Sequence, residues 1–208
     1  MRLIVITTEN FFDGEADAVN LLFENGLELL HIRKPYASQH ETEDFIGQIN
    51  ENFHARIVIH DYYELINMFS LKGIHYNCRN YDITLHNDEP ASHSRRLYNL
   101  SISRSCHSLN EVSESQFYDY VFLSPIFDSI SKAGYKQRFT PKKLNEAKAE
   151  KIINEHVIAL GGITAENMRE AYSYGFGGVA VIGALWSDFA VNKNKNNLLE
   201  RFFELKVG

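Results

Sequence analysis

The chain has 208 residues, of which 44% are hydrophobic, and its formal net charge is -6. This length allows one domain with a sizeable core, and the acidic balance gives no general attraction to nucleic acid or to an anionic membrane. No apolar run approaches the length of a membrane span, and residues 1–8 are too short and too rich in β-formers for a signal peptide, so we expect a cytoplasmic protein. Cys78 and Cys106 lack the spacing of a metal or redox motif, which predicts two ordinary thiols.

Short segments rich in β-forming residues alternate with longer polar segments of helical character, which is typical of a parallel sheet joined by helices. We predict strands at residues 3–8, 28–33, 55–60, 73–76, 98–103, 120–124, 156–160 and 178–182. We predict helices at residues 14–25, 41–52, 63–69, 89–95, 109–115, 141–151, 165–174 and 184–203. The alternation of asparagine and lysine at residues 192–197 indicates a solvated helix start or loop. Eight strand–helix units predict a single (β/α)8 TIM barrel domain over residues 1–208.

Two glycine-bearing segments near the end of the chain each have the form of a buried strand followed by a tight turn. In the first, Gly161 and Gly162 follow an apolar strand and allow a backbone with φ > 0, and Thr164 can cap the helix that follows. In the second, Ile182 and Gly183 end the last predicted strand. Backbone N–H groups of both turns would meet at the carboxyl edge of a barrel, which favours binding of a phosphorylated small molecule over turns that only close the barrel.

Polar side chains lie at the C-terminal ends of four successive predicted strands, the edge where (β/α)8 enzymes keep their chemistry. They are His31 and Arg33, His60 and Asp61, His75 and Asn77, and Ser103, Ser105 and His107. The three histidines on neighbouring strands suggest a metal cluster, although hydrogen-bonded packing or substrate contacts are more common for such histidines. Arg33 at the end of a buried strand needs an anion, which is either Asp61 or a carboxylate or phosphate of a substrate.

Residues 125–139, after the sixth predicted strand, have no helical period and combine hydroxyl side chains with Lys132, Lys136 and Arg138. This composition predicts an active-site loop over an anion, with a solvated loop charge as the alternative role of Lys132.

Eight short motifs occur in the order expected of one enzyme family. They are Leu30-His-Ile-Arg33, Ile57-Val-Ile-His-Asp61, Gly73-Ile-His75, Ser105-Cys-His-Ser108, Asp119-Tyr-Val-Phe-Leu-Ser-Pro-Ile-Phe127, Ser129-Ile-Ser-Lys132, Leu160-Gly-Gly-Ile163 and Gly178-Val-Ala-Val181. Together these motifs resemble thiamine phosphate synthase and its sister enzyme, thiazole tautomerase, over nearly the whole chain. The resemblance implies a (β/α)8 barrel that binds thiazole phosphate, and it does not choose between the two activities.

The chain departs from the synthase pattern at several charged positions. The synthase has a diphosphate-binding lysine where this chain has Pro35. The sequence leaves open whether the neighbouring Lys34 takes over the role of that lysine. Asp61 is similar to one magnesium ligand, whereas Asn80 stands where the resemblance implies the second magnesium carboxylate. Asp82 could substitute for that carboxylate only in a rebuilt loop. Since magnesium is usually held by one or two carboxylates plus substrate phosphates, these departures weaken the site without abolishing it.

Other family features are kept. Ser129, Ser131 and Lys132 preserve both hydroxyls and the cation of a family motif similar to Thr-x-Thr-Lys. The segment around His107 resembles the Ser-x-His-Ser motif of the tautomerase, which implies a catalytic acid/base. Without that resemblance, a residue near the cap of the helix predicted at 109–115 is the more common role for a histidine such as His107.

The two activities make different demands on these residues. A synthase needs magnesium and cations to stabilise the diphosphate that leaves, whereas a tautomerase needs a phosphate cradle, a group for a carboxylate and an acid/base, but no cofactor. We therefore favour a thiazole tautomerase with His107 as acid/base and a substrate contacted by His31, Arg33, His60, Ser105, Ser129, Ser131 and Lys132. The alternatives are the magnesium-dependent synthase, which joins hydroxymethylpyrimidine diphosphate to thiazole phosphate, and a non-catalytic paralogue that binds a precursor. A homodimer is compatible with each of these hypotheses.

Overall fold

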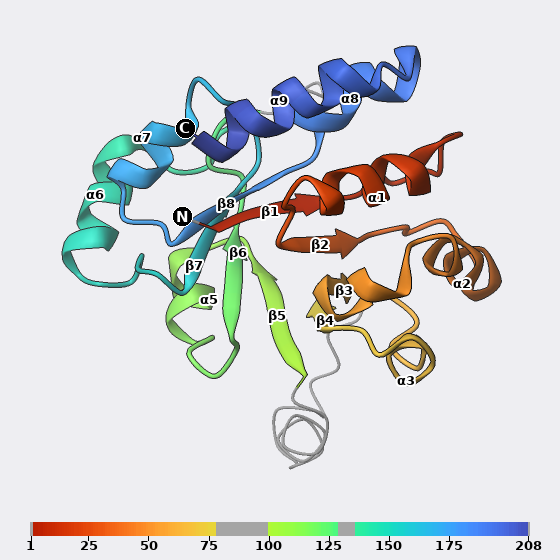
Figure 1. Cartoon of the computed structure of the whole chain (residues 1–208). Coiled ribbons are helices and arrows are strands. Elements are labelled where there is room, and N and C mark those ends of the chain that lie inside the picture. The colour runs from red at the N-terminus through yellow and green to blue at the C-terminus, as the bar shows by residue number, and fades with distance from the viewer. Residues whose placement is uncertain (1, 78–99, 129–135, 208) are drawn as a thin grey trace.

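Eight parallel strands close into a barrel in the computed structural model, which describes residues 2–77, 100–128 and 136–207 (Figure 1). Each strand pairs with the next along the chain, and β8 returns to pair with β1. The strands are β1 (Arg2–Ile6), β2 (Leu29–Ile32), β3 (Ile57–Ile59), β4 (Gly73–Tyr76), β5 (Ser101–Cys106), β6 (Tyr120–Leu123), β7 (Val157–Leu160) and β8 (Gly178–Val181). This closed parallel barrel confirms the (β/α)8 prediction.

Helices connect the strands and surround the barrel (Figure 1). They are α1 (Glu15–Glu24), α2 (Gln39–Gly47), α3 (Leu65–Phe69), α5 (Leu109–Ser113), α6 (Pro141–Ala149), α7 (Met168–Ser173), α8 (Gly183–Asn192) and α9 (Lys195–Val207), with a short 3-10 helix, η1 (Glu51–Arg56). The helix predicted at residues 89–95 lies outside the described residues. Within the described ranges, no helix has both the length and the apolar character needed to span a bilayer.

The helix predicted at residues 41–52 is divided in two. Helix α2 starts earlier, with Ser38 as its cap, and ends at Gly47, whereas η1 starts at Glu51. The side chain of Asn50 accepts the N–H of Asn52 over 3.0 Å and so begins η1. Asparagine competes in this way with the backbone of a continuing helix, which explains the interruption.

The last predicted helix, at residues 184–203, is also two helices. Lys193 follows α8 in the left-handed region, with φ 54°. The side chain of Asn194 accepts the N–H groups of Asn196 and Asn197, over 3.1 and 3.2 Å, at the start of α9. The prediction of a single helix at residues 184–203 was wrong. The interpretation of residues 192–197 as a helix start or loop is confirmed.

Strand β5 begins three residues later than predicted, at Ser101 rather than at residue 98. Ile102 packs into the core under the helices, while the hydroxyls of Ser103 and Ser105 point to His75 on β4. The inward face of this strand is therefore hydroxyl-bearing, and the apolar alternation that marks a half-buried strand is missing from it.

The barrel interior has an apolar half and a polar half. The apolar half comes from β1, β6, β7 and β8, and contains Ile4, Ile6, Tyr120, Phe122, Ile158 and Ala180. The polar half comes from β2 to β5, and its buried polar side chains are His31, His60, His75 and Ser103. A larger apolar core fills the space between the barrel and the helices. The sequence thus places the buried histidines of the barrel interior on one side only.

Candidate active site

The turn after β7 accepts only glycine at two positions. Gly161 has φ 97° and Gly162 has φ 66°, a region that L side chains rarely adopt. A Cβ on Gly161 would lie 2.9 Å from Cα of Pro125, and one on Gly162 would lie 2.3 Å from the carbonyl oxygen of Asp128. The loop after β6 is hydrogen-bonded to the same turn, since the N–H of Phe127 donates to the carbonyl of Gly161 over 3.1 Å. Two loops therefore meet backbone to backbone at the carboxyl edge.

Helix α8 starts beside this turn, because β7 and β8 are neighbours in the barrel. It begins at Gly183, directly after Ile182, and the indole Nε1 of its buried Trp186 donates to the carbonyl of Ile6 over 2.8 Å. The first N–H groups of a helix have no partner within the helix and carry the positive end of its dipole. The two turns predicted to cradle a phosphate are thus adjacent, and phosphate binding there stays a prediction.

Thr164 and Asn167 shape the segment that leaves the glycine turn. The N–H of Thr164 donates to Oδ1 of Asn167 over 2.9 Å, and the N–H of Asn167 donates to Oγ1 of Thr164 over 3.4 Å. The amide of Asn167 also donates to the carbonyl of Gly162 over 2.7 Å. Since α7 begins only at Met168, Thr164 closes the turn before the helix, and Asn167 is the cap residue.

His107 lies just beyond β5 and reaches toward the end of β6. Its Nδ1 is 3.2 Å from the carbonyl oxygen of Ser124 and 3.2 Å from the Ser124 hydroxyl. A carbonyl oxygen only accepts, so in the tautomer that makes this bond the hydrogen is on Nδ1 and the lone pair of the neutral ring is on Nε2. The cap of α5 is Ser108, whose hydroxyl accepts the N–H of Glu111 over 3.2 Å. The His107 ring is therefore not part of that cap.

Three histidines from successive strands meet in the polar half of the barrel. Nδ1 of His31 lies 2.9 Å from Nε2 of His60, and the rings of His60 and His75 stack with centroids 4.2 Å apart. Nε2 of His31 lies 2.6 Å from the hydroxyl of Tyr120. Burial, with His75 as a second cause, lowers the pKa of His31 well below its usual value, and burial raises the pKa of Tyr120. At neutral pH, His31 and Tyr120 are therefore both uncharged.

The ring of His75 lies between two hydroxyls of β5. Its Nδ1 is 2.8 Å from Oγ of Ser103, and its Nε2 is 2.9 Å from Oγ of Ser105. Burial, assisted by the cations of Arg33 and Arg104, lowers the pKa of His75 to about 3. His31 and His75 are completely enclosed, so the substrate contacts predicted for His31 concern a side chain beneath the edge rather than on it.

Two cations after β2 have anionic partners in the protein. Nη1 of Arg33 lies 2.8 Å from Oε1 of Glu9, with both side chains 27% exposed. Nζ of Lys34 lies 2.8 and 2.6 Å from the two carboxylate oxygens of Glu15, and these side chains are only 1% exposed. Lys34 therefore does not take the place of the lysine that the synthase pattern has at the next position.

Asp61 follows β3 and is half-buried at the carboxyl edge. Magnesium takes one or two carboxylates plus substrate phosphates, so Asp61 fits one ligand of such an ion. Several predicted residues lie outside the described part of the chain, namely Cys78, Asn80, Asp82, Ser129, Ser131 and Lys132. The magnesium and loop predictions that depend on them stay predictions.

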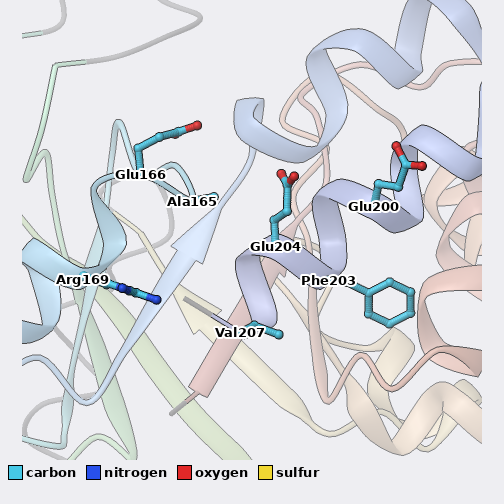
Figure 2. Close-up of a pocket in the computed structure, with 7 residues that line it drawn as sticks. All are labelled: Ala165, Glu166, Arg169, Glu200, Phe203, Glu204 and Val207. Atoms are coloured by element: carbon cyan, nitrogen blue, oxygen red, sulfur yellow. The ribbon is translucent and has the colours of Figure 1, made fainter.

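An open groove of about 730 Å³ lies on the outer layer, between the start of α7 and helix α9 (Figure 2). Glu166 and Arg169 line one side, and Glu200 and Glu204 line the other, beside the ring of Phe203. Three carboxylates and one guanidinium are the wrong charge for a phosphorylated ligand. The polar carboxyl edge of the barrel is therefore the better candidate site.

Sequence reasoning missed Tyr120, Ser124, Glu9 and Glu15 as partners of the site residues. Side chains of a strand alternate between its two faces, so Tyr120 and Phe122 of β6 both point into the barrel. This two-residue period was the signal in the sequence that could have identified Tyr120. The two glutamates had no comparable signal, because their contacts with Arg33 and Lys34 arise only when β1 and β2 pair.

The fold and its polar carboxyl edge define a (β/α)8 barrel of the enzyme type. The family model of thiamine monophosphate synthase matches residues 3–185. The chain belongs to this family, whose members are enzymes of thiamine biosynthesis, and the resemblance seen in its motifs is confirmed.

Relatives of known name match almost the full length of the chain. A thiamine-phosphate synthase of Desulfitobacterium hafniense is 26% identical over 88% of this chain and 89% of that protein. A thiamine-phosphate synthase of Methanococcus maripaludis is 24% identical over 96% of this chain and 94% of that protein. The crystal structure of thiamine phosphate pyrophosphorylase from Bacteroides thetaiotaomicron has a TM-score of 0.82 and 40% identity, over 99% of this chain and 96% of that one.

Proposed function

We propose that the protein is a thiamine-phosphate synthase, which joins hydroxymethylpyrimidine diphosphate to thiazole phosphate and releases diphosphate. The observation that carries this proposal is the 40% identity to the Bacteroides thetaiotaomicron pyrophosphorylase over 99% of this chain. The Desulfitobacterium and Methanococcus relatives bear the corresponding synthase name. These names favour the synthase, the alternative in the sequence analysis, over the tautomerase, its main hypothesis.

In this proposal, the phosphate of thiazole phosphate lies against the backbone N–H groups of Gly161, Gly162, Ile182 and Gly183. The left-handed glycines leave no Cβ between the ligand and the peptide units, and the start of α8 favours negative charge. Nε2 of His107 can accept a hydrogen bond from the substrate, since its Nδ1 is turned to Ser124.

The departing diphosphate is the part of the reaction that needs positive charge. Asp61 would hold magnesium together with the diphosphate oxygens, and the bound ion stabilises the charge that builds on the leaving group. Arg33, 27% exposed and anchored by Glu9, keeps further N–H groups for an anion. Lys132, in the loop after β6, is proposed as the second protein cation.

Thiazole tautomerase remains a second candidate because of one observation. The ammonium of Lys34 is buried against Glu15 and Pro35 follows it, so this strand end supplies one cation fewer than the synthase pattern expects. His107, as an acid/base held by Ser124, meets the main demand of a tautomerase without magnesium.

The decisive experiment presents purified protein with each set of substrates. Thiamine phosphate formed from the pyrimidine diphosphate and thiazole phosphate, only with magnesium, supports the synthase. Conversion of a thiazole carboxylate phosphate to its aromatic tautomer, with no thiamine phosphate formed, overturns it in favour of the tautomerase. Binding of thiazole phosphate with neither reaction identifies a non-catalytic paralogue. The Gly162→Ala variant serves as the control that removes the proposed phosphate site.

A further inference from the structure

We propose that His31, His60 and His75 together bind one divalent transition-metal ion of the Zn²⁺ type inside the barrel. Each offers one ring nitrogen, and these three nitrogens lie within 4.8 Å of one another. All three side chains are buried, and they come from β2, from the residue after β3 and from β4. Among the residues that the structure describes, no other group of three histidine, cysteine or carboxylate side chains meets the same spacing.

The separation of the nitrogens is close to what a tetrahedral ion requires. Zn²⁺ binds imidazole nitrogen at about 2.0–2.1 Å, so two nitrogens on one ion are about 3.3 Å apart. Nδ1 of His31 and Nε2 of His60 are 2.9 Å apart, within a few tenths of an ångström of that separation. The nitrogen that His75 offers lies at most 4.8 Å from these two, so it needs to approach by about 1.5 Å at most when the ion binds.

The surrounding hydrogen bonds allow one nitrogen lone pair of each of the three imidazoles to face the same ion. The cluster does not have to lose a proton for this. The contact between His31 and His60 contains one hydrogen, which can move to the other nitrogen of the same imidazole. The neutral Tyr120 hydroxyl, 2.6 Å from Nε2 of His31, then accepts the N–H of that ring. A hydroxyl of β5 does the same for His75. Such outer hydrogen bonds to ligand imidazoles are a regular feature of zinc sites.

The donor set selects the class of ion. Neutral imidazoles suit zinc, copper, nickel and cobalt, whereas magnesium and calcium prefer oxygen ligands. Three protein ligands leave a fourth position, which zinc sites fill with water or a substrate atom. The site does not include Asp61, the proposed magnesium ligand, so its test is independent of the proposed function.

Binding is tested on the full chain, without an affinity tag and freed of metal by chelation. Titration with Co²⁺ should give one ion per chain with the intense visible bands of four-coordinate cobalt, and Zn²⁺ but not Mg²⁺ should displace it. Zn²⁺ should raise the midpoint of thermal unfolding, because an ion bound only by the folded chain stabilises it. In His60→Asn the affinity should fall by more than about 100-fold, since removing a ligand costs more than removing an outer partner.

The matched control is His40→Asn, which removes an imidazole that is 82% exposed and should leave binding unchanged. A wild-type chain that binds no stoichiometric Co²⁺, or a His60→Asn variant with unchanged spectrum and affinity, would overturn the proposal. Should His60→Asn not fold, the ring-nitrogen resonances of the wild-type chain decide. Zinc should shift the ring-nitrogen resonances of His31, His60 and His75. Unshifted resonances would reject the site.

Discussion

Lys34, just after β2, and Glu15, at the start of α1, form an ion pair that is closed to solvent, with Nζ 2.6 Å from Oε2 and both side chains 1% exposed. Burial raises the pKa of Glu15 and lowers the pKa of Lys34, and their mutual attraction opposes both shifts. Each charge is therefore acceptable inside the protein only while the other is present.

Glu15→Gln should lower the free energy of unfolding by about 3–5 kcal/mol, because it leaves the ammonium of Lys34 buried without a counter-ion. The double variant Glu15→Leu, Lys34→Met should recover most of that loss, since an apolar pair of similar volume needs no such partner. Urea unfolding measures both changes. Glu146→Gln breaks the exposed pair with Lys142 and should change stability by less than about 0.5 kcal/mol. Equal effects of the two glutamine variants would contradict this account.

Gly162→Ala should destabilise the fold by at least about 2 kcal/mol, because φ is 66° and the new Cβ would meet the carbonyl of Asp128. Affinity for thiazole phosphate should fall with it, and calorimetric titration measures that loss. The control is Gly47→Ala, at the end of α2, where nothing lies within 4 Å of the added Cβ. That variant should be as stable as wild type or more stable by up to about 1 kcal/mol. Undisturbed phosphate binding in Gly162→Ala would remove the turn from the site.

His107→Asn separates the two candidate activities. Isomerisation of a thiazole carboxylate phosphate should slow by about 10²–10⁴-fold, because the titrating group that moves the proton is gone. Formation of thiamine phosphate should change far less, since stabilisation of the leaving diphosphate does not depend on that group. Rates for both substrate sets measure the difference. An isomerisation rate within about threefold of wild type would exclude His107 as the base.

The metal-free protein should lose stability as the pH falls below 6.5. In the unfolded chain His75 titrates near 6.5, whereas in the folded chain burial and the cations Arg33 and Arg104 lower its pKa to about 3, beside His31 and His60. Between these values the unfolded chain binds more protons, so the free energy of unfolding decreases by up to about 1.4 kcal/mol per pH unit for this histidine. Urea unfolding with a chelator present, at pH 7 and pH 5, measures the slope. His75→Gln should reduce this slope, while His31, whose pKa burial also lowers, keeps its own contribution. An unchanged slope would show that His75 is not responsible.

The barrel and its glycine turns could be predicted because their signals are local. Apolar strands recur at regular spacing, and Gly161 and Gly162 follow one of them directly. The contents of the barrel could not be predicted in this way. His31 and Tyr120 are 89 residues apart in the sequence, and their hydrogen bond exists only because the barrel closes. The carboxylate partners of Arg33 and Lys34 were missed for the same reason.

Element ends were harder to predict than element positions. The start of strand β5 was predicted three residues too early, because the inward residues of this strand are serines. The C-terminal segment was predicted as one helix, whereas Lys193 in a left-handed conformation divides it into two. Both features depend on which side chains find hydrogen-bond partners, and periodicity does not report this.

The apolar half of the barrel interior joins the two ends of the chain, since Ile4 and Ile6 of β1 pack with Ile158 and Ala180. On the opposite side, β3 is three residues long and pairs with β4 at only two registered positions. Amide hydrogens of β1, β6, β7 and β8 should therefore exchange with solvent last, and those of β3 and β4 first. We therefore expect local opening to occur at the seam between β3 and β4, beside His60 and His75. Such opening would admit water or an ion to the polar interior while the contacts between Ile4, Ile6, Ile158 and Ala180 stay closed.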